Sequence, residues 1–353
     1  MCEDKEKTKY FKKCLGYCIT GEVTAKSFFI LIGPDGDNGK STLISEVLMP
    51  IFGNKFITNI KRKVLFDMGN QSKNEDEMAK DMAKLVGKRI AICNEPSDGL
   101  TMNESEIKAI TGNDLAQAKK LYRDPFDFIP IVKIMILTNK YVKFDDTSGP
   151  MKKRCKIFKM LASFTDKPPK RHGCYKRDEG FIHDLKTKYK SEIFTWLCIG
   201  ANQYYKDDNL NPPEVSIKEM NEYIEQIDST QLFLNEECDF NEKILVQRTE
   251  LFDYFISWCK DKNEHMITRE KFYDKLRSRK LQEKKSNGQR MICGLKIKED
   301  EEKKPTKKIT NLCQKIEDPY ENGVNHKDQS ITVVLSDDCD SDCDEDFTKI
   351  VFD

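Results

Sequence analysis

Residues 33–42 read GPDGDNGKST, and this stretch decides the fold. It follows a continuous apolar run, Ser27–Ile32, of the kind found in strands that are buried on both faces. A helical pattern then extends from Thr42 up to Pro50. A glycine-rich loop between a buried strand and a helix can turn its backbone N–H groups toward phosphates, and the helix N-terminus adds partial positive charge. The sequence therefore predicts a phosphate-binding loop.

The residues of this loop have separate expected roles. Lys40 would reach the β- and γ-phosphates of ATP, and Ser41 would place its hydroxyl on Mg²⁺. Five residues rather than four separate Gly33 from Gly39, so the loop is one residue longer than the strict pattern. The alternative is a Gly-Asp turn that happens to precede a Lys-Ser pair. We predict ATP and Mg²⁺ as cofactors, with the nucleotide held by Gly33, Gly36, Asn38, Gly39, Lys40, Ser41 and Thr42.

Two further apolar strands, Arg89–Cys93 and Val132–Leu137, lead into polar residues. A P-loop ATPase needs an acid at such a strand end to position Mg²⁺ and polarise the attacking water. Glu95 is the candidate, as a catalytic residue and, with Ser41, as a Mg²⁺ ligand. Asn139 is placed to sense the γ-phosphate. The alternatives are a surface acid and an ordinary capping asparagine.

A basic run, Lys152-Lys153-Arg154, precedes the apolar pair Ile157-Phe158. Arg154 could act as an arginine finger that stabilises charge in the transition state of phosphoryl transfer. Taken alone, such a run is more often a solvated basic surface.

Patterning divides the chain into five segments. We predict a helical lead-in over 1–26, an ATPase core over 27–165, a helical segment over 166–240, a basic winged-helix-like module over 241–298 and a disordered acidic tail over 299–353. Strands alternate with helices in the second segment, which predicts an α/β fold with a parallel central sheet.

The second helix of the basic module, Thr268–Leu281, carries six basic residues within twelve positions. This density favours the phosphates of a nucleic acid over a merely solvated face. Arg277, Arg279 and Lys280 are the contacts that we predict here.

Composition limits the class of protein. The chain has 353 residues with 60 basic and 60 acidic side chains, but the acids gather near the C-terminus and leave a basic body. No apolar run approaches the roughly 18–20 residues of a membrane span, and residues 1–5 do not resemble a signal peptide. Thirteen irregularly spaced cysteines then suggest reduced thiols in an intracellular protein. His172, Cys174 and His183 lack a firm fourth ligand and make a weak case for zinc.

Four features, in this order, resemble the superfamily 3 helicases. They are NGKST at Asn38–Thr42, the strand that ends in Glu95-Pro96, the segment K-x-x-T-G-N-D at Lys108–Asp114 and the strand that ends in Asn139. Within that superfamily the chain looks like the helicase half of the primase-helicases of poxviruses, other large DNA viruses, satellite phages and plasmids. The resemblance extends from about Tyr10 to about Lys298, and nothing in the chain looks like a primase domain.

The resemblance implies an AAA+-like ATPase core and a ring, in this family a homo-hexamer, that draws single-stranded DNA through its centre. ATP would be hydrolysed between subunits, and Arg154 would reach into the neighbour's site. Lys108 would open a segment that leads into a central hairpin, where Lys119 and Lys120 would contact DNA phosphates. The chain departs from the family at Asn113, where glycine is usual, and at Lys119, where arginine is usual.

The function that we expect is an ATP-dependent DNA helicase of viral or mobile-element replication, acting in the cytoplasm or nucleus of a host cell if viral. The alternatives are an ATPase motor for packaging or RNA translocation, and a degenerate helicase that binds DNA without turnover. In the tail, Ile331–Leu335 precedes seven acids between Asp337 and Asp346. This segment resembles a SUMO-interacting motif and could also bind a replication partner. A solubilising acidic tail is the alternative.

Overall fold

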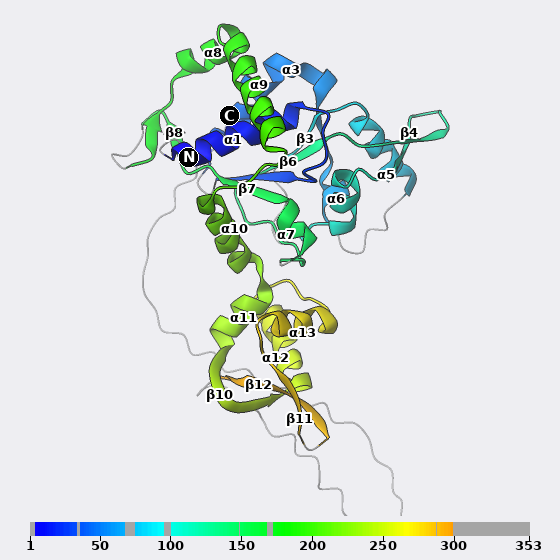
Figure 1. The fold of residues 1–353 in the computed structure, drawn as a ribbon, viewed down its shortest axis with the longest axis vertical. Helices are drawn as coiled ribbons and strands as arrows, with labels where there is room; N and C mark the ends of the chain where they lie inside the picture. Colours follow the sequence, from blue (N-terminus) through cyan, green and yellow to red (C-terminus); the bar gives the residue numbers. More distant parts are fainter. Residues whose placement is uncertain are drawn as a thin grey trace, which may run out of the picture. The chain divides into compact units, whose positions relative to one another are not determined.

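The computed structural model describes residues 4–33, 36–67, 75–94, 100–147, 149–167, 172–286 and 288–298 (Figure 1). These residues belong to one compact unit of the chain. Glu95, the segment Ile331–Leu335 and the rest of the predicted disordered tail lie outside the described residues, so those interpretations stay predictions. No helix in the described ranges is long and apolar enough to cross a membrane.

A five-stranded parallel sheet forms the centre of the N-terminal part, which confirms the predicted α/β fold. The strand order is β2-β3-β6-β1-β7, which places β1 and the phosphate loop that follows it between two neighbours. The strands are β1 (Phe28–Ile32), β2 (Ile57–Asn59), β3 (Ile90–Asn94), β6 (Lys133–Thr138) and β7 (Cys155–Lys159).

Both faces of this sheet are covered, and β1 shows why its sequence is apolar throughout. Phe28, Ile30 and Ile32 point into one hydrophobic cluster, whereas Phe29 and Leu31 point into another. The first cluster is closed by α4 (Arg62–Leu65), α5 (Glu75–Met82) with the 3₁₀ turn Ala83–Leu85, α6 (Glu104–Thr111), α7 (Pro150–Arg154) and α10 (Glu214–Ile227). The second is closed by α1 (Lys5–Ile19), the helix after the loop and α9 (Lys190–Asp207). A strand buried on both faces needs no polar alternation.

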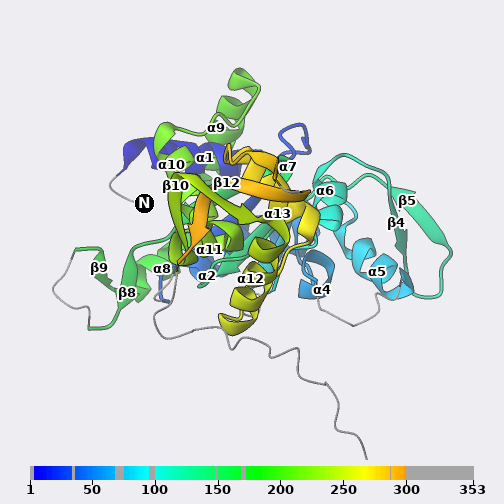
Figure 2. The same ribbon diagram turned by 90° about the horizontal axis from the view of Figure 1, so that it is seen from below.

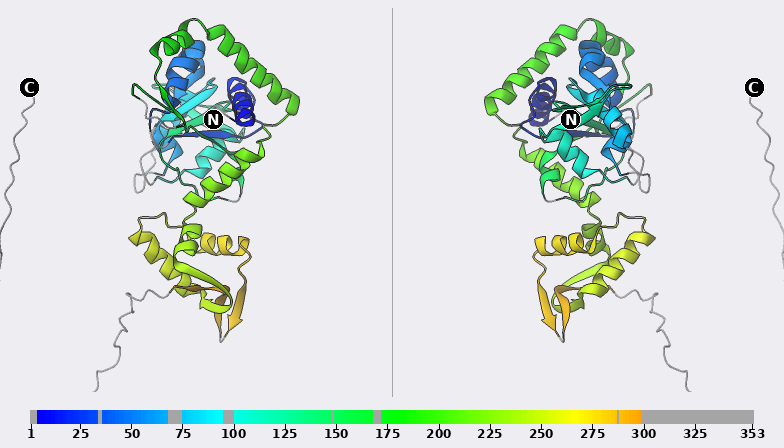
Figure 3. Two further views of the ribbon diagram at one scale, coloured as in Figure 1. Left: turned by 90° about the vertical axis from the view of Figure 1, so that its left-hand side faces the viewer. Right: turned by 90° about the vertical axis from the view of Figure 1, so that its right-hand side faces the viewer.

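Helices α1 and α9 are in backbone contact, although they come from opposite ends of the core (Figure 3). A Cβ on Gly16 would lie 2.1 Å from the backbone nitrogen of Ala201, and a Cβ on Gly200 would lie 2.2 Å from the carbonyl oxygen of Lys12. Only glycine allows so close an approach. The N-terminal helix is therefore an integral part of the core.

The helix after the loop continues past the point where its sequence predicts an end. It consists of α2 (Lys40–Thr42), a π-helical segment (Leu43–Leu48) and α3 (Met49–Phe56), so that Pro50 lies inside it. Proline lacks the N–H that would bond to the preceding turn, and the wider π turn just before it absorbs the mismatch.

The C-terminal part has its own aromatic core, centred on Phe233, Phe255 and Phe272. Its elements are α11 (Ser229–Glu237), β10 (Cys238–Gln247), α12 (Arg248–Asp261), α13 (Arg269–Ser278), β11 (Glu283–Ser286) and β12 (Gln289–Ile297), with strand order β10-β12-β11. The predicted basic second helix and closing strand correspond to α13 and β12. The domain boundaries drawn from the sequence stay predictions. Helix α10, which lies in the predicted helical segment 166–240, packs on the ATPase sheet through Met220 and Tyr223.

Candidate nucleotide and nucleic-acid sites

The phosphate loop joins the carboxyl end of β1 to α2. The N–H of Gly33 donates to the carbonyl of Thr138 on β6 (3.1 Å), which fixes the start of the loop to the neighbouring strand. Gly36 and Gly39 have φ of 72° and 77°, a region that favours glycine. Asp37, with φ of 43°, is also left-handed, so three of the described loop residues have positive φ before the helix begins at Lys40.

Lys40 lies across the mouth of this loop and is only 8% exposed. Its Nζ donates to the carbonyl of Gly33 (3.0 Å), to Asn38 Oδ1 (3.2 Å) and to Asn139 Oδ1 (2.7 Å). A Cβ on Gly33 would come within 2.4 Å of Asn38 Oδ1 and 2.8 Å of Lys40 Nζ. The structure thus brings together Lys40 and Asn139, which the sequence predicts at one site from positions 99 residues apart.

Two more residues, Ser41 and Glu95, are predicted to belong to this edge of the sheet. Ser41 is exposed at the first turn of the helix, where its hydroxyl is available to a cation. Glu95 is outside the described residues, but Asn94 before it lies opposite Leu137 in the β3–β6 register. The β3 strand therefore ends at the same edge as β6 and Asn139.

A short two-stranded sheet lies against the loop and carries an aromatic pair. In β8 (Ser163–Thr165), the N–H of Phe164 donates to the carbonyl of Asp37 (2.9 Å). Tyr175 in β9 (Cys174–Lys176) stacks on Phe164 with ring centroids 5.7 Å apart. Asn38 Nδ2 donates to the carbonyl of Ala162 (2.9 Å), which fixes the loop to this sheet. The sequence analysis missed the pair, and an aromatic on each of two short strands after the core was its only signal.

Arg154 lies at the opposite edge of the sheet. It precedes Cys155, which is paired with Phe28 at the start of β1, whereas the phosphate loop follows Ile32 at the end of β1. About 13 Å of strand separates these two ends, at roughly 3.3 Å per residue. Arg154 Nη1 donates to Thr111 Oγ1 (3.0 Å) at the end of α6. Within the chain, Arg154 therefore lies at the other end of the strands from Lys40.

A hairpin lies where the resemblance implies one, with strands β4 (Ala116–Lys119) and β5 (Pro125–Phe128) antiparallel beside α5 (Figure 2), and its place in a ring stays a prediction. Lys119 Nζ pairs with Asp76 (2.9 Å), and Lys120 Nζ lies 5.8 Å from the ring centroid of Phe126. At the turn, Tyr122 has φ of 56° and is 95% exposed. The sequence analysis missed Tyr122, an aromatic residue set among basic ones.

Other residues predicted to contact nucleic acid have acidic partners in the chain itself. Lys108 Nζ lies 3.0 Å from Glu104 and 3.4 Å from Asp146. Arg277 pairs with Asp274 and, at 3.2 Å, with Glu283. Lys280, just past the end of α13, is exposed.

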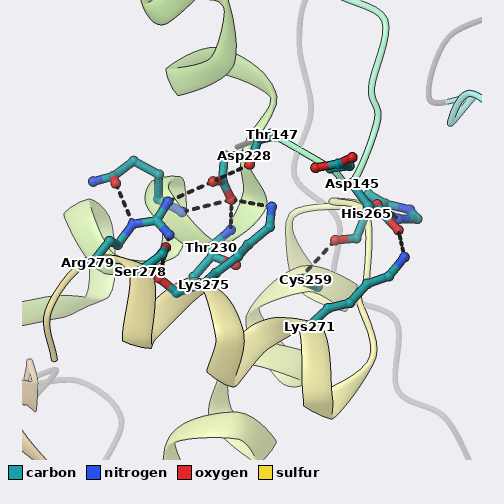
Figure 4. A network of polar contacts seen from close by, with 12 residues as sticks. Asp145, Thr147, Asp228, Thr230, Cys259, His265, Lys271, Lys275, Ser278 and Arg279 are labelled. Carbon is teal, nitrogen blue, oxygen red and sulfur yellow. Dashed lines mark hydrogen bonds and ion pairs between the residues drawn. The ribbon is translucent and has the colours of Figure 1, made fainter. Parts of the chain in front are cut away.

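Two acids, Asp145 and Asp228, form ion pairs with three basic residues in and just after α13 (Figure 4). Asp228, only 2% exposed, accepts from Lys275 (2.9 Å) and Arg279 (2.7 Å). Asp145 lies 2.7 Å from both Lys271 Nζ and His265 Nε2. Burial would raise the pKa of Asp145, but these two partners outweigh it and lower the pKa to about 2.

A zinc site at His172, Cys174 and His183 has no geometric support. No group of three or more His, Cys, Asp or Glu side chains is arranged to hold a metal ion in the part of the chain that the structure describes.

Comparison with known proteins gives a family and a relative. A family of unknown function, DUF5906, matches residues 31–154, about a third of the chain. The chain is also 24% identical over 240 residues to "Putative helicase L207/L206" of Acanthamoeba polyphaga mimivirus. Over these residues the chain is helicase-like. The match covers 66% of this helicase-like chain and 24% of the relative, so it spans about a quarter of the viral protein.

Two solved structures show weaker likeness. The apo structure of the NrS-1 C-terminal region has a TM-score of 0.42 and 10% identity, covering 82% of the helicase-like chain and 72% of that chain. JCV helicase with a bound acetamide compound has a TM-score of 0.26 and 10% identity, covering 65% of each chain. At these TM-scores neither likeness establishes a shared fold.

Proposed function

We propose that this helicase-like chain is an ATP-dependent DNA helicase of viral or mobile-element replication, which works as a homo-hexameric ring with ATP hydrolysed between subunits. One observation carries the proposal. The amino group of Lys40 meets Asn139 at the loop on one edge of the sheet, and Arg154 stands at the opposite edge. Such an arrangement suits a site that two subunits complete together.

The chain's own residues define the near half of that site. Bound ATP with Mg²⁺ would supply the transferable phosphoryl group. Lys40 would neutralise phosphate charge, Ser41 and Glu95 would hold the metal ion, and Asn139 would orient the terminal phosphate. The aromatic face of Phe164 and Tyr175 is placed to stack on the nucleotide base.

The far half would come from the neighbouring subunit. Arg154 would stabilise the charge that develops on the transferred group, which is the role of an arginine finger supplied in trans. The β4–β5 hairpin would face the DNA, with Lys119 and Lys120 near the phosphates and Tyr122 available to stack on a base.

DNA-stimulated ATP hydrolysis and strand displacement by the purified chain test this function. The wild-type chain should show both activities, and Lys40→Ala should show neither. Lys55→Ala, which removes an exposed lysine from the same run of helix, is the matched control and should keep both. If the wild-type chain forms a ring but hydrolyses no ATP, the result would favour a degenerate helicase that binds DNA without turnover. Hydrolysis stimulated by RNA or without strand displacement would favour a motor with another task.

A further inference from the structure

The basic face of α13 is occupied within the chain. Five of the six basic residues between 269 and 280 have an acidic partner within ion-pair distance, and three of these five bind Asp145 or Asp228 (Figure 4). Asp228 is almost fully buried, and its carboxylate would be left with uncompensated charge if Lys275 and Arg279 turned to another partner. Lys275 and Arg279 are therefore poor ligands for nucleic-acid phosphates.

The hairpin that follows α13 carries basic residues without such acidic partners in the described ranges. The hairpin of β11 and β12 exposes three basic residues, called here the hairpin cations: Lys284, Lys285 and Arg290. The acid at the start of β11, Glu283, already lies 3.5 Å from Arg248 and 3.2 Å from Arg277. Within the described ranges no acidic side chain lies within ion-pair distance of a hairpin cation.

The register of the hairpin places two of these charges together. Lys285 is directly opposite Arg290 in the antiparallel pair, and Lys284 is opposite Met291. Side chains directly opposite in such a pair have Cβ atoms about 4.5–5.5 Å apart, and like charges there destabilise the sheet. An anion between them would remove the repulsion. A phosphate oxygen is small enough to accept from both side chains.

We propose that the β11–β12 hairpin binds the phosphate backbone of DNA through the hairpin cations, and that α13 is held by Asp145 and Asp228 instead. The proposal relies on the proposed function only in taking DNA as the polyanion. It moves the nucleic-acid contact of this module from the helix that the sequence indicates to the hairpin that follows it.

Salt dependence of DNA binding tests the proposal directly. The full chain and a triple variant, Lys284→Gln with Lys285→Gln and Arg290→Gln, would be titrated against a fluorescent single-stranded oligonucleotide at several salt concentrations, without ATP. The slope of log K against log salt should fall by about 2 for three lost contacts, at about 0.7 for each phosphate of single-stranded DNA. Affinity near 0.1 M salt should fall by about tenfold to a hundredfold.

A matched control removes the same charge elsewhere. Lys190, Lys206 and Lys218 are exposed on other helices, and the three changes to Gln should leave the slope unchanged. Lys285→Glu separates folding from binding, because Glu at this position would pair with Arg290. Its melting temperature should rise while its affinity for DNA falls. An unchanged slope in the triple variant, or an equal loss in the control, would overturn the proposal.

The two proposals fail separately. If the wild-type chain hydrolyses no ATP, the helicase function is wrong while the change in salt slope can still be measured. If hydrolysis and strand displacement are present but the triple variant binds DNA with the same salt slope as the wild type, only the hairpin proposal is wrong.

Discussion

The two edges of the parallel sheet each hold a buried lysine, and the two lysines differ in what surrounds them. Lys40 lies at the carboxyl edge, next to a glycine-rich loop and an exposed serine. Lys133 begins β6 at the amino edge and is 1% exposed. Its Nζ donates to the carbonyls of Thr20 (2.6 Å) and Ile131 (3.3 Å) and lies 4.9 Å from the ring centroid of Tyr17.

The difference teaches that burial alone does not mark a functional cation. At the amino edge, the residues that follow α1 cover Lys133, and burial, with a smaller contribution from Arg89, lowers its pKa to about 8. At the carboxyl edge, the oxygens around Lys40 belong to a loop and to strand ends where ligands bind in open α/β sheets. We therefore propose the carboxyl edge as the catalytic one, whereas Lys133 serves internal packing.

The largest effect should come from Lys40. In Lys40→Ala, ATP hydrolysis should fall by about a thousandfold or more, because the charge that faces the phosphates is lost. Lys133→Met should keep hydrolysis within a few-fold of the wild-type rate. Steady-state phosphate release measures both. Equal losses in the two variants would break the comparison between the edges.

Arg154 tests whether the amino edge also serves a neighbour's site. Arg154→Ala should lower hydrolysis by about 10³-fold and keep nucleotide binding, since an arginine finger acts on the transition state. Mixing Arg154→Ala with Glu95→Gln chains should restore part of the activity, because some interfaces then combine an intact loop with an intact arginine. If mixtures stay inactive, the trans-acting role is wrong.

The lowered pKa of Lys133 makes the free energy of unfolding depend on pH. The folded-state pKa of about 8 is below the usual 10.5, so the unfolded chain binds more protons between these values. Relative to Lys133→Met, the wild-type free energy of unfolding should therefore rise with pH from about 8 to 10.5, by up to about 3 kcal/mol. The comparison includes the nearby thiol of Cys18, whose pKa burial raises and Lys133 in part lowers. Urea unfolding at pH 7.5 and 10 measures the difference, and parallel pH profiles would contradict it.

The smallest effect should come from the aromatic pair beside the loop. Phe164→Ala should raise the KM for ATP by about two- to tenfold and change kcat little, because a stacking contact of about 0.5–1.5 kcal/mol is lost. Phe181→Ala, which removes an exposed phenylalanine further along the chain, is the control. If both variants have the same KM for ATP, Phe164 does not contact the nucleotide.

Local patterns were enough to predict three of the five strands of the sheet, β1, β3 and β6, and the meeting of Lys40 with Asn139. The apolar run of β1, the glycines of the loop and the strand before Asn139 are each visible within a few residues, and their meeting follows from parallel pairing. β7 was not recognised as a strand, because Cys155–Lys159 alternates apolar and basic residues at the edge of the sheet.

Ion pairs across long separations could not be predicted in the same way. Basic residues of α13 appear free in the sequence, yet their partners Asp145 and Asp228 are 126 and 47 residues away from Lys271 and Lys275. A count of charges within a helix says nothing about acids that the fold brings to it. The exposed tip at Tyr122 was missed for a related reason, since only the paired strands show that a turn presents it.

The glycine contact between α1 and α9 sets an order of events during synthesis. Gly16 leaves the ribosome early, but the surface against which it packs includes Gly200 and Ala201. Until those residues emerge, α1 can pack on the sheet through Phe29 and Phe158, but the side of α1 that contacts α9 has no cover. Contacts over such a separation form slowly. A nascent chain that stops in the loop before α9 would hold the five strands of the parallel sheet without α9 over one face. That face should therefore be completed late in translation, when α9 packs on a helix made almost two hundred residues earlier.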